Sequence, residues 1–136
     1  MFHLAFPVQN LNETIDFYTL ILGAKIGRSS STWVDFDLYT NQITVHQDAN
    51  FKKLVPVFGA EDVPVNHFGI ILTFSDWQKL KEEITKKNIP FLIAPKIVFE
   101  GKTGEQYSFF VEDPNGYAIE FKGFADLEKV FAPNES

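Results

Sequence analysis

The chain has 136 residues, of which 45% are hydrophobic and 15% aromatic, and its formal net charge is −6. This size suits one compact domain, and the acidic balance without a basic cluster excludes nucleic acid and anionic membranes as partners. Because the sequence has no cysteine, it has neither disulfides nor thiolate ligands, and any metal must take nitrogen and oxygen donors.

The first 48 residues are predicted to form a strand, a helix and three further strands. Residues 2–8 alternate like a strand, and Asn10 or Asn12 can cap the following helix. Gly23 is expected just past the end of this helix. The next three strands are expected at 25–28, 33–39 and 42–47. The first residues show neither a charged leader nor a cleavage site, and no apolar run approaches a membrane span, so we expect a soluble cytoplasmic protein.

The same order of elements is expected a second time. Residues 49–64 are irregular and are interpreted as a connection with a short helical turn. A strand over 65–74 then leads into a helix that is capped by Ser75 or Asp76 and runs to about Lys87. Three further strands are predicted at 91–93, 107–112 and 116–122, before a tail over 125–136. The sequence therefore predicts an α+β fold of two βαβββ modules, 1–48 and 65–124, within one domain.

This duplication selects a small set of polar residues. The chain has three histidines, and His3 and His67 each stand early in the first strand of a module. A gapless match of Val34–His46 with Ser108–Glu120 pairs the third, His46, with Glu120. All three histidines and Glu120 then occupy corresponding places in the two modules.

Each of these four residues has a small neighbour two positions away on its own strand face. These neighbours are Ala5, Thr44, Gly69 and Ala118. A carboxylate such as Glu120 in the middle of a strand is costly unless a cation or a donor receives its charge. A lone strand histidine is more often a surface or core residue, and Glu120 alone also fits a salt bridge. The set as a whole predicts a divalent metal ion in a cavity.

Two motifs point to a known superfamily. They are Asp16-Phe17-Tyr18 with Leu22-Gly23 at the end of the first helix, and Asp113-Pro-Asn-Gly-Tyr-Ala-Ile-Glu-Phe in the last strands. The chain, to about Phe124, resembles the vicinal oxygen chelate superfamily, which includes glyoxalase I, methylmalonyl-CoA epimerase, extradiol dioxygenases, and fosfomycin- and bleomycin-resistance proteins. The resemblance implies paired βαβββ modules whose sheets curl into a partly open eight-stranded barrel around one divalent ion.

The resemblance also implies a ligand set, which is His3, His46, His67 and Glu120. In glyoxalase I-like members the second of these places is often Glu, and in epimerase-like members it is often Gln, so His46 departs from both. Extradiol enzymes use two histidines and one glutamate, which match His3, His67 and Glu120. In that case His46 would be an acid/base residue, or a ligand that leaves when substrate binds.

Such a site supports three functions. The first is a metal-dependent isomerase, epimerase or lyase of the glyoxalase kind, acting on a small substrate chelated through neighbouring oxygens, with Glu120 and His46 as catalytic residues. The second is an Fe(II) extradiol dioxygenase, and the third is a non-catalytic binding protein like those of bleomycin resistance. The donors fit Fe, Mn, Co, Ni or Zn.

Further residues are candidates for substrate binding. They are Arg28, Trp33, Thr44, Phe99, Glu105 and Tyr107. The resemblance implies a homodimer, in which the site lies either within one chain or across the subunit interface.

Overall fold

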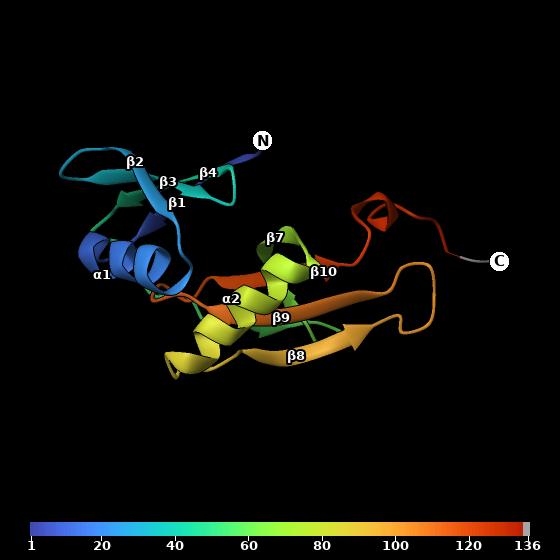
Figure 1. The fold of residues 1–136 in the computed structure, drawn as a ribbon. Coiled ribbons are helices and arrows are strands. Elements are labelled where there is room, and N and C mark those ends of the chain that lie inside the picture. Colours follow the sequence, from blue (N-terminus) through green and yellow to red (C-terminus); the bar gives the residue numbers. More distant parts are fainter. Residues whose placement is uncertain (135–136) are drawn as a thin grey trace. The chain divides into compact units, whose positions relative to one another are not determined.

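The computed structural model describes residues 1–134, which form two compact units. The first unit consists of residues 1–56 and 113–117, and the second of residues 57–112 and the chain from Ala118 onward. Each unit contains one four-stranded sheet and one longer helical segment, which confirms the predicted α+β class and the two βαβββ modules (Figure 1). Each sheet is open and has two edge strands.

The sheet of the first unit has the strand order β1-β4-β3-β2, with β1 and β4 parallel and the other pairs antiparallel. Asn10 caps the helix as predicted, because its side-chain oxygen accepts a hydrogen bond from the Glu13 N–H at 2.9 Å. Gly23 follows the helical segment with φ +77°, as expected of a residue at that place. The elements are β1 (His3–Val8), α1 (Leu11–Asp16), a π-helical turn η1 (Phe17–Ile21), β2 (Lys25–Ser29), β3 (Trp33–Leu38) and β4 (Asn41–Gln47).

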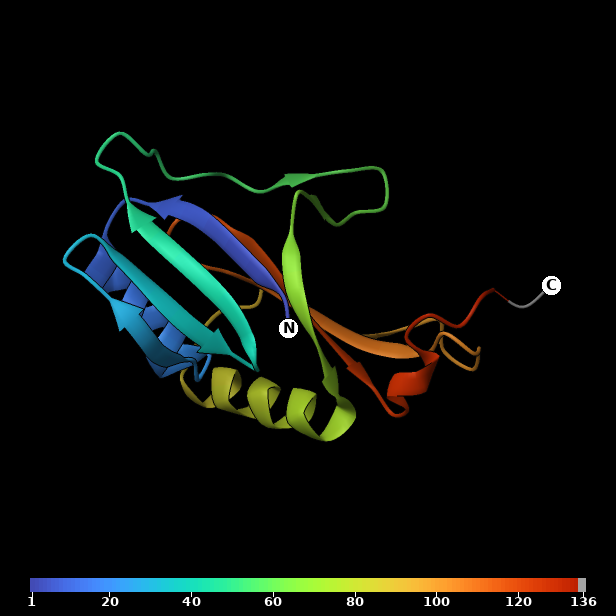
Figure 2. The ribbon, with the colours of Figure 1, turned by 90° about the horizontal axis from the view of Figure 1, so that it is seen from above.

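The sheet of the second unit has the order β7-β10-β9-β8, with β7 and β10 parallel. The helix α2 runs along this sheet (Figure 2). The elements are β5 (Val57–Phe58), β6 (Pro64–Val65), β7 (Phe68–Thr73), α2 (Phe74–Lys86), β8 (Ile93–Val98), β9 (Gln106–Glu112), β10 (Ala118–Phe124) and a 3₁₀ turn η2 (Leu127–Lys129).

Helix α2 begins earlier than the sequence predicts. Its cap is Thr73, whose hydroxyl oxygen accepts a hydrogen bond from the Asp76 N–H at 3.2 Å, so Ser75 and Asp76 lie inside the first turn. The buried residues of α2 are Trp77, Leu80 and Ile84. The Trp77 Nε1–H also donates to the Phe121 carbonyl at 2.9 Å, which fixes the helix to the central strand of the sheet.

The connection between the modules differs from the prediction. The expected helical turn is absent from residues 49–64, and the short strands β5 and β6 form an antiparallel ribbon there and at Val65. Strand β8 is longer than predicted and runs to Val98, so the following loop covers only residues 99–105. Local composition does not reveal β5 and β6, because strands of two residues carry too little alternation.

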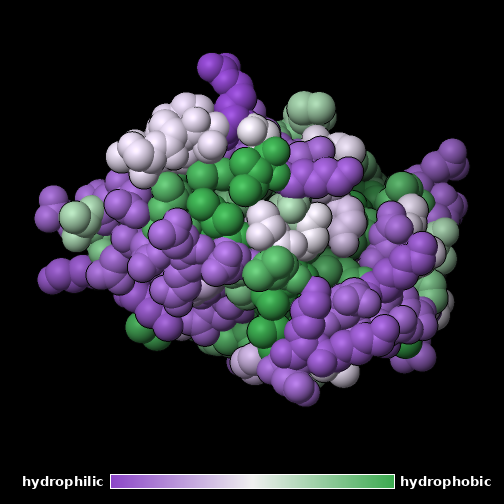
Figure 3. Space-filling view, turned by 60° about the vertical axis from the view of Figure 1, so that its left-hand side comes forward, coloured by the Kyte–Doolittle hydropathy of each residue, from purple (hydrophilic) through white to green (hydrophobic). Residues whose placement is uncertain are grey.

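The surface is mixed in polarity. On the face drawn in Figure 3, hydrophilic side chains surround smaller areas of exposed hydrophobic side chains. Exposed residues of this kind include Leu20 and Ile26, and single exposed apolar side chains are ordinary in soluble folds. No helix within residues 1–134 is long and apolar enough to cross a membrane.

The turn at residues 113–117 packs into the first unit, although β9 and β10 on either side of it belong to the second. The Asp113 carboxylate is only 2% exposed and accepts four hydrogen bonds. Two come from the N–H groups of Asn115 and Tyr117, one from the Asn115 side-chain amide, and one from the Tyr18 hydroxyl at 3.0 Å. Burial raises the pKa of Asp113 above its usual value. The turn is therefore part of the first unit, and we call Asp113 with its four hydrogen bonds the staple of this unit.

Tyr117 extends this staple and gives it a pH dependence. Its hydroxyl donates to the Pro7 carbonyl at 2.8 Å, and burial, followed by the charge of Asp113, raises the pKa of Tyr117 to about 12. The pKa in the folded protein exceeds the ordinary value of 10.0. The stabilisation by the protonated phenol is therefore complete below pH 10.0 and is lost as the pH rises through about 12. Tyr117→Phe should cost about 1 kcal/mol at neutral pH.

Urea unfolding of wild type and Tyr117→Phe at neutral and alkaline pH measures this effect. We expect the difference in stability between the two proteins to shrink as the pH rises through about 12. A difference that stays constant over this range would show that the phenol makes no pH-dependent contribution.

Candidate metal centre

Two of the predicted ligands meet in the second unit. His67 directly precedes β7, and Glu120 lies in the middle of β10, opposite Gly69 in the parallel register. The His67 Nε2 and the Glu120 Oε1 are 3.2 Å apart, and the two side chains are 29% and 13% exposed. Both residues, together with Lys122, line a hollow of about 240 Å³.

Each of these side chains is held by a second contact. The His67 Nδ1 lies 2.6 Å from the Pro64 carbonyl oxygen. Because a carbonyl only accepts, the proton of a neutral imidazole is on Nδ1 and Nε2 has a free lone pair. The Glu120 Oε2 accepts a hydrogen bond from the Ser108 hydroxyl at 2.6 Å. A lone pair and a carboxylate oxygen therefore face each other, and this arrangement requires a proton or a cation between them.

A divalent metal ion fits this pair. Two donors that are each about 2.1 Å from an ion, at angles between about 90° and 109°, lie roughly 3.0 to 3.4 Å apart. The observed 3.2 Å falls in that range. Within residues 1–134, no group of three or more histidine or acidic side chains stands close enough to hold an ion, so the pair is half of the predicted set.

The other two predicted ligands lie in the first unit, but in different rows of its sheet. His3 is opposite Gln42, whereas His46 is opposite Pro7 on one side and Trp33 on the other. His3 and His46 are therefore four residues apart along paired strands, which corresponds to roughly 13 Å. Both belong to the face opposite Ile43 and Val45, which is the face that also carries Thr44.

The strand registers change the correspondence between the modules. When Leu4 of β1 is matched to Phe68 of β7, their partners Ile43 and Ile119 match as well. Thr44 then corresponds to Glu120, and the gapless alignment that pairs His46 with Glu120 is wrong by two residues. The registers match Phe36 of β3 with Val111 of β9, so the gapless match is already wrong by one residue on this strand. The second module's turn, residues 113–117 against 38–41, is one residue longer and adds the second.

Thr44 forms a polar pair of its own. Its hydroxyl donates to the Asp35 carboxylate at 2.6 Å, and the two residues are directly opposed on β4 and β3. Asp35, together with Ser108 in the second unit, was missed by the sequence analysis. The available signal was the alternation of Trp33, Asp35 and Asp37 in a strand whose intervening residues are buried.

The remaining predicted residues are dispersed. Arg28 and Asp35 line a cavity of about 340 Å³ in the first unit. Phe99 lines a different cavity in the second unit and has the left-handed φ of 57°. The Glu105 carboxylate accepts a hydrogen bond from the Gly101 N–H at 3.0 Å. Tyr107 stacks on Phe74 of α2, with ring centroids 4.3 Å apart, and so lies on the opposite side of the sheet from Glu120.

Comparison with known proteins places this arrangement in context. The family model of the Glyoxalase/Bleomycin resistance protein/Dioxygenase superfamily matches residues 1–121. A glyoxalase/bleomycin resistance protein/dioxygenase from Alicyclobacillus acidocaldarius is 29% identical, with 96% of each chain covered and a TM-score of 0.80.

Two more distant structures share the fold. A glyoxalase/dioxygenase from Nostoc punctiforme is 14% identical, with 91% of this chain and 90% of that chain covered and a TM-score of 0.69. The fosfomycin resistance protein FosX from Listeria monocytogenes, in a mutant complex with Mn(II) and dihydroxypropylphosphonic acid, is 16% identical; 98% of this chain and 97% of that chain are covered, with a TM-score of 0.69.

Proposed function

The chain belongs to the Glyoxalase/Bleomycin resistance protein/Dioxygenase superfamily, and from that premise we propose that it is a metal-dependent enzyme acting on a small substrate through two neighbouring oxygens. The proposed ligands are His3, His67 and Glu120. The observation that carries the proposal is the free lone pair of His67, which faces the Glu120 carboxylate at 3.2 Å. The Mn(II) bound by the distant relative FosX supports a divalent ion.

When bound, the ion would polarise the substrate and stabilise negative charge on its oxygens, as in isomerase, epimerase or lyase reactions. Ser108 keeps the Glu120 carboxylate oriented. The Thr44 hydroxyl is held by Asp35, and we propose that it orients a substrate oxygen. We propose His46 as an acid/base residue rather than a ligand, and the strand register, in which Thr44 corresponds to Glu120, supports this proposal.

The same register favours a second candidate, the extradiol dioxygenase reaction. A set of two histidines and one glutamate is what the resemblance associates with these enzymes, and Thr44 leaves the fourth place without a strong ligand. Oxygen consumption by the Fe(II)-loaded protein with catechols would identify this reaction. Isomerisation or epimerisation without oxygen uptake would identify the first. A pure protein that binds small molecules but no metal would instead be a binding protein.

Metal titration of variants tests the ligand set. We expect Glu120→Gln to weaken Mn(II) binding by about a hundredfold or more, because a ligand is lost, and Ser108→Ala to weaken it by about tenfold, because only the orientation of Glu120 is lost. His46→Ala should bind Mn(II) like wild type. Binding to the chelator-treated protein can be followed by the loss of the free Mn(II) signal in electron paramagnetic resonance.

Two outcomes would contradict this assignment. Wild-type affinity in Glu120→Gln would remove Glu120 from the ligand set, and a loss in His46→Ala equal to that in Glu120→Gln would restore His46. We also propose a homodimer. Mixing His3→Ala with Glu120→Gln protomers tests how its sites are built, because recovery of Mn(II) binding would show that ligands from two subunits form one site.

A further inference from the structure

A cavity of about 660 Å³ lies in the second unit. It is bounded by the loop that joins β8 to β9 and by the C-terminal segment after β10, which Figures 1 and 2 both show near each other. The described residues that line it include no acidic side chain. Its apolar lining includes Phe99, Phe124 and Val130, and its polar lining includes Lys102, Gln106 and Lys129.

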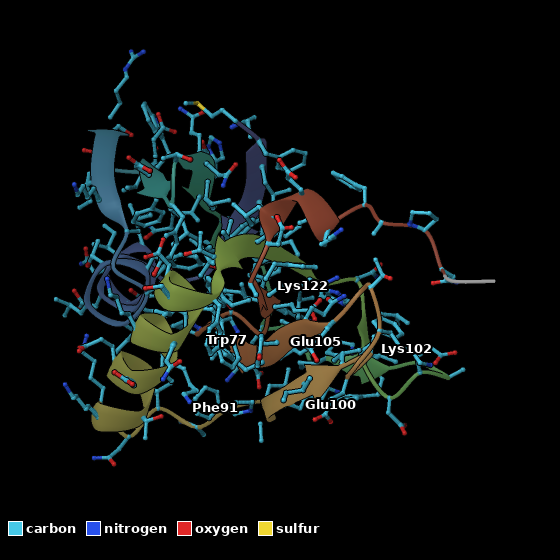
Figure 4. The ribbon with its side chains drawn as sticks, turned by 45° about the vertical axis from the view of Figure 1, so that its right-hand side comes forward. Trp77, Phe91, Glu100, Lys102, Glu105 and Lys122 are labelled. Carbon is cyan, nitrogen blue, oxygen red and sulfur yellow. The ribbon has the colours of Figure 1, made fainter. Side chains whose placement is uncertain are left out.

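The two lysines of this cavity have no carboxylate partner among residues 1–134. Within residues 1–134, the close contacts between basic and acidic side chains are those of His67 with Glu120 and of Glu83 with Lys86 and Lys87. Neither Lys102 nor Lys129 takes part in them. Figure 4 shows Glu100 and Glu105 on the same loop as Lys102. The Glu105 carboxylate is occupied by the loop backbone at Gly101, and neither acid lines the cavity. Two ammonium groups that no carboxylate of the described chain neutralises, beside apolar side chains, are suited to an anion.

The cavity lies on the same sheet face as Glu120. Phe121 bonds to Trp77 through its carbonyl, and a Cβ on Gly123 would meet the Trp77 side chain at 2.7 Å, so Gly123 faces α2. Side chains alternate along β10, so Glu120, Lys122 and Phe124 share the opposite face. The distance from Glu120 to Phe124 is four residues, or roughly 13 Å along the strand.

Lys122 lies on β10 between Glu120 and Phe124, which lines the cavity. It is half-buried, lies opposite Ser108 in the sheet, and takes part in none of the ion pairs among the described residues. Figure 4 shows Lys122 on β10 and Lys102 at the loop. A series of free cations therefore extends from the His67–Glu120 pair toward the cavity.

We propose that this cavity binds the anionic end of the substrate, an extended amphipathic molecule with a carboxylate, sulfonate or phosphate group. Lys102 and Lys129 receive the anionic group, and Phe99, Phe124 and Val130 contact the apolar part. The other end of the molecule reaches the His67–Glu120 pair along the path lined by Lys122. The assignment to a substrate rests on the proposed function, whereas the binding of the anion depends only on the cavity.

The first experiment uses metal-free protein and naphthalene-1-sulfonate as the probe, with neutral 1-naphthalenemethanol as the control probe. Titration followed by amide NMR should shift signals in residues 99–106 and 124–134. Lys102→Gln and Lys129→Gln should each raise Kd about threefold, and the double variant about tenfold. Lys53→Gln, an exposed lysine in the first unit, should leave Kd unchanged. The proposal would be overturned if wild type and the double variant had equal Kd, or if the neutral probe bound as tightly as the sulfonate. Signal shifts outside residues 99–106 and 124–134 would overturn it as well.

The second experiment links the cavity to the metal pair. Mn(II) added to the complex of wild type with naphthalene-1-sulfonate should broaden the proton signals of the probe. Zn(II) should not broaden them. In the complex with Glu120→Gln, Mn(II) should not broaden them either. Mn(II) binding without broadening would show that cavity and ion do not serve one molecule. Failure of Mn(II) to bind at all would overturn the proposed function and the assignment to a substrate, even if the probe still binds.

Discussion

Asp113→Ala is expected to lower the free energy of unfolding by about 3 to 5 kcal/mol, the largest effect on stability that we predict. The substitution removes the acceptor of four hydrogen bonds inside the first unit. The Tyr18 hydroxyl is then left in a position that is 0% exposed. A buried donor without an acceptor loses its full hydration, so the cost exceeds that of the broken bonds alone. Urea unfolding measures the difference.

Tyr18→Phe is the matched control, because it removes one of the four donors and leaves the acceptor in place. We expect it to cost about 1 kcal/mol. Asp113→Asn should fall between the two. Because burial raises the pKa of Asp113, the carboxyl contributes most below its ordinary value of 3.8, and that contribution is lost as the pH rises through the raised pKa. Equal losses in Asp113→Ala and Tyr18→Phe would show that Asp113 is not the centre of the staple.

The sequence predicted the fold well where the signal is local. Asn10 and Gly23 were placed correctly because a cap and a left-handed residue are defined by a few neighbouring bonds. The sequence also predicts a break between the strands expected at 107–112 and 116–122, which is where the turn lies. It could not show that this turn packs with Tyr18, because that contact joins residues far apart in the chain. The cap of α2 was misplaced because Thr73, Ser75 and Asp76 are all good capping residues.

The metal pair shows the same limit. Duplication selects His67 and Glu120 as candidate ligands, and their side chains are 3.2 Å apart in the structure. His46 was matched to Glu120 through an alignment that is wrong by two residues. Since side chains alternate with a period of two, the shift of two residues on β4 leaves the residues of this strand on their predicted face. The pattern of polar and small residues therefore looked consistent, and only the strand pairing distinguishes Thr44 from His46.

Gly69 was expected to leave space around the metal, and the structure gives it a different role. A Cβ at Gly69 would lie 1.9 Å from the Glu120 carbonyl oxygen and 2.8 Å from its carbonyl carbon. The backbone of β7 therefore approaches β10 at the residue that carries the proposed ligand. Gly69→Ala must push the two strands apart, which should cost about 2 to 4 kcal/mol of stability.

The same displacement should move His67 away from Glu120, so Gly69→Ala is also expected to weaken Mn(II) binding by about tenfold or more. Gly27→Ala is the matched control, since a Cβ there meets its nearest atom at an ordinary 3.6 Å. Urea unfolding and Mn(II) titration of both variants separate the effects. If Gly69→Ala matched Gly27→Ala in stability, the close approach of the strands would be refuted. If it lost stability but kept full Mn(II) affinity, the ion would not depend on the spacing of His67 and Glu120, and the proposed centre would have to be placed elsewhere.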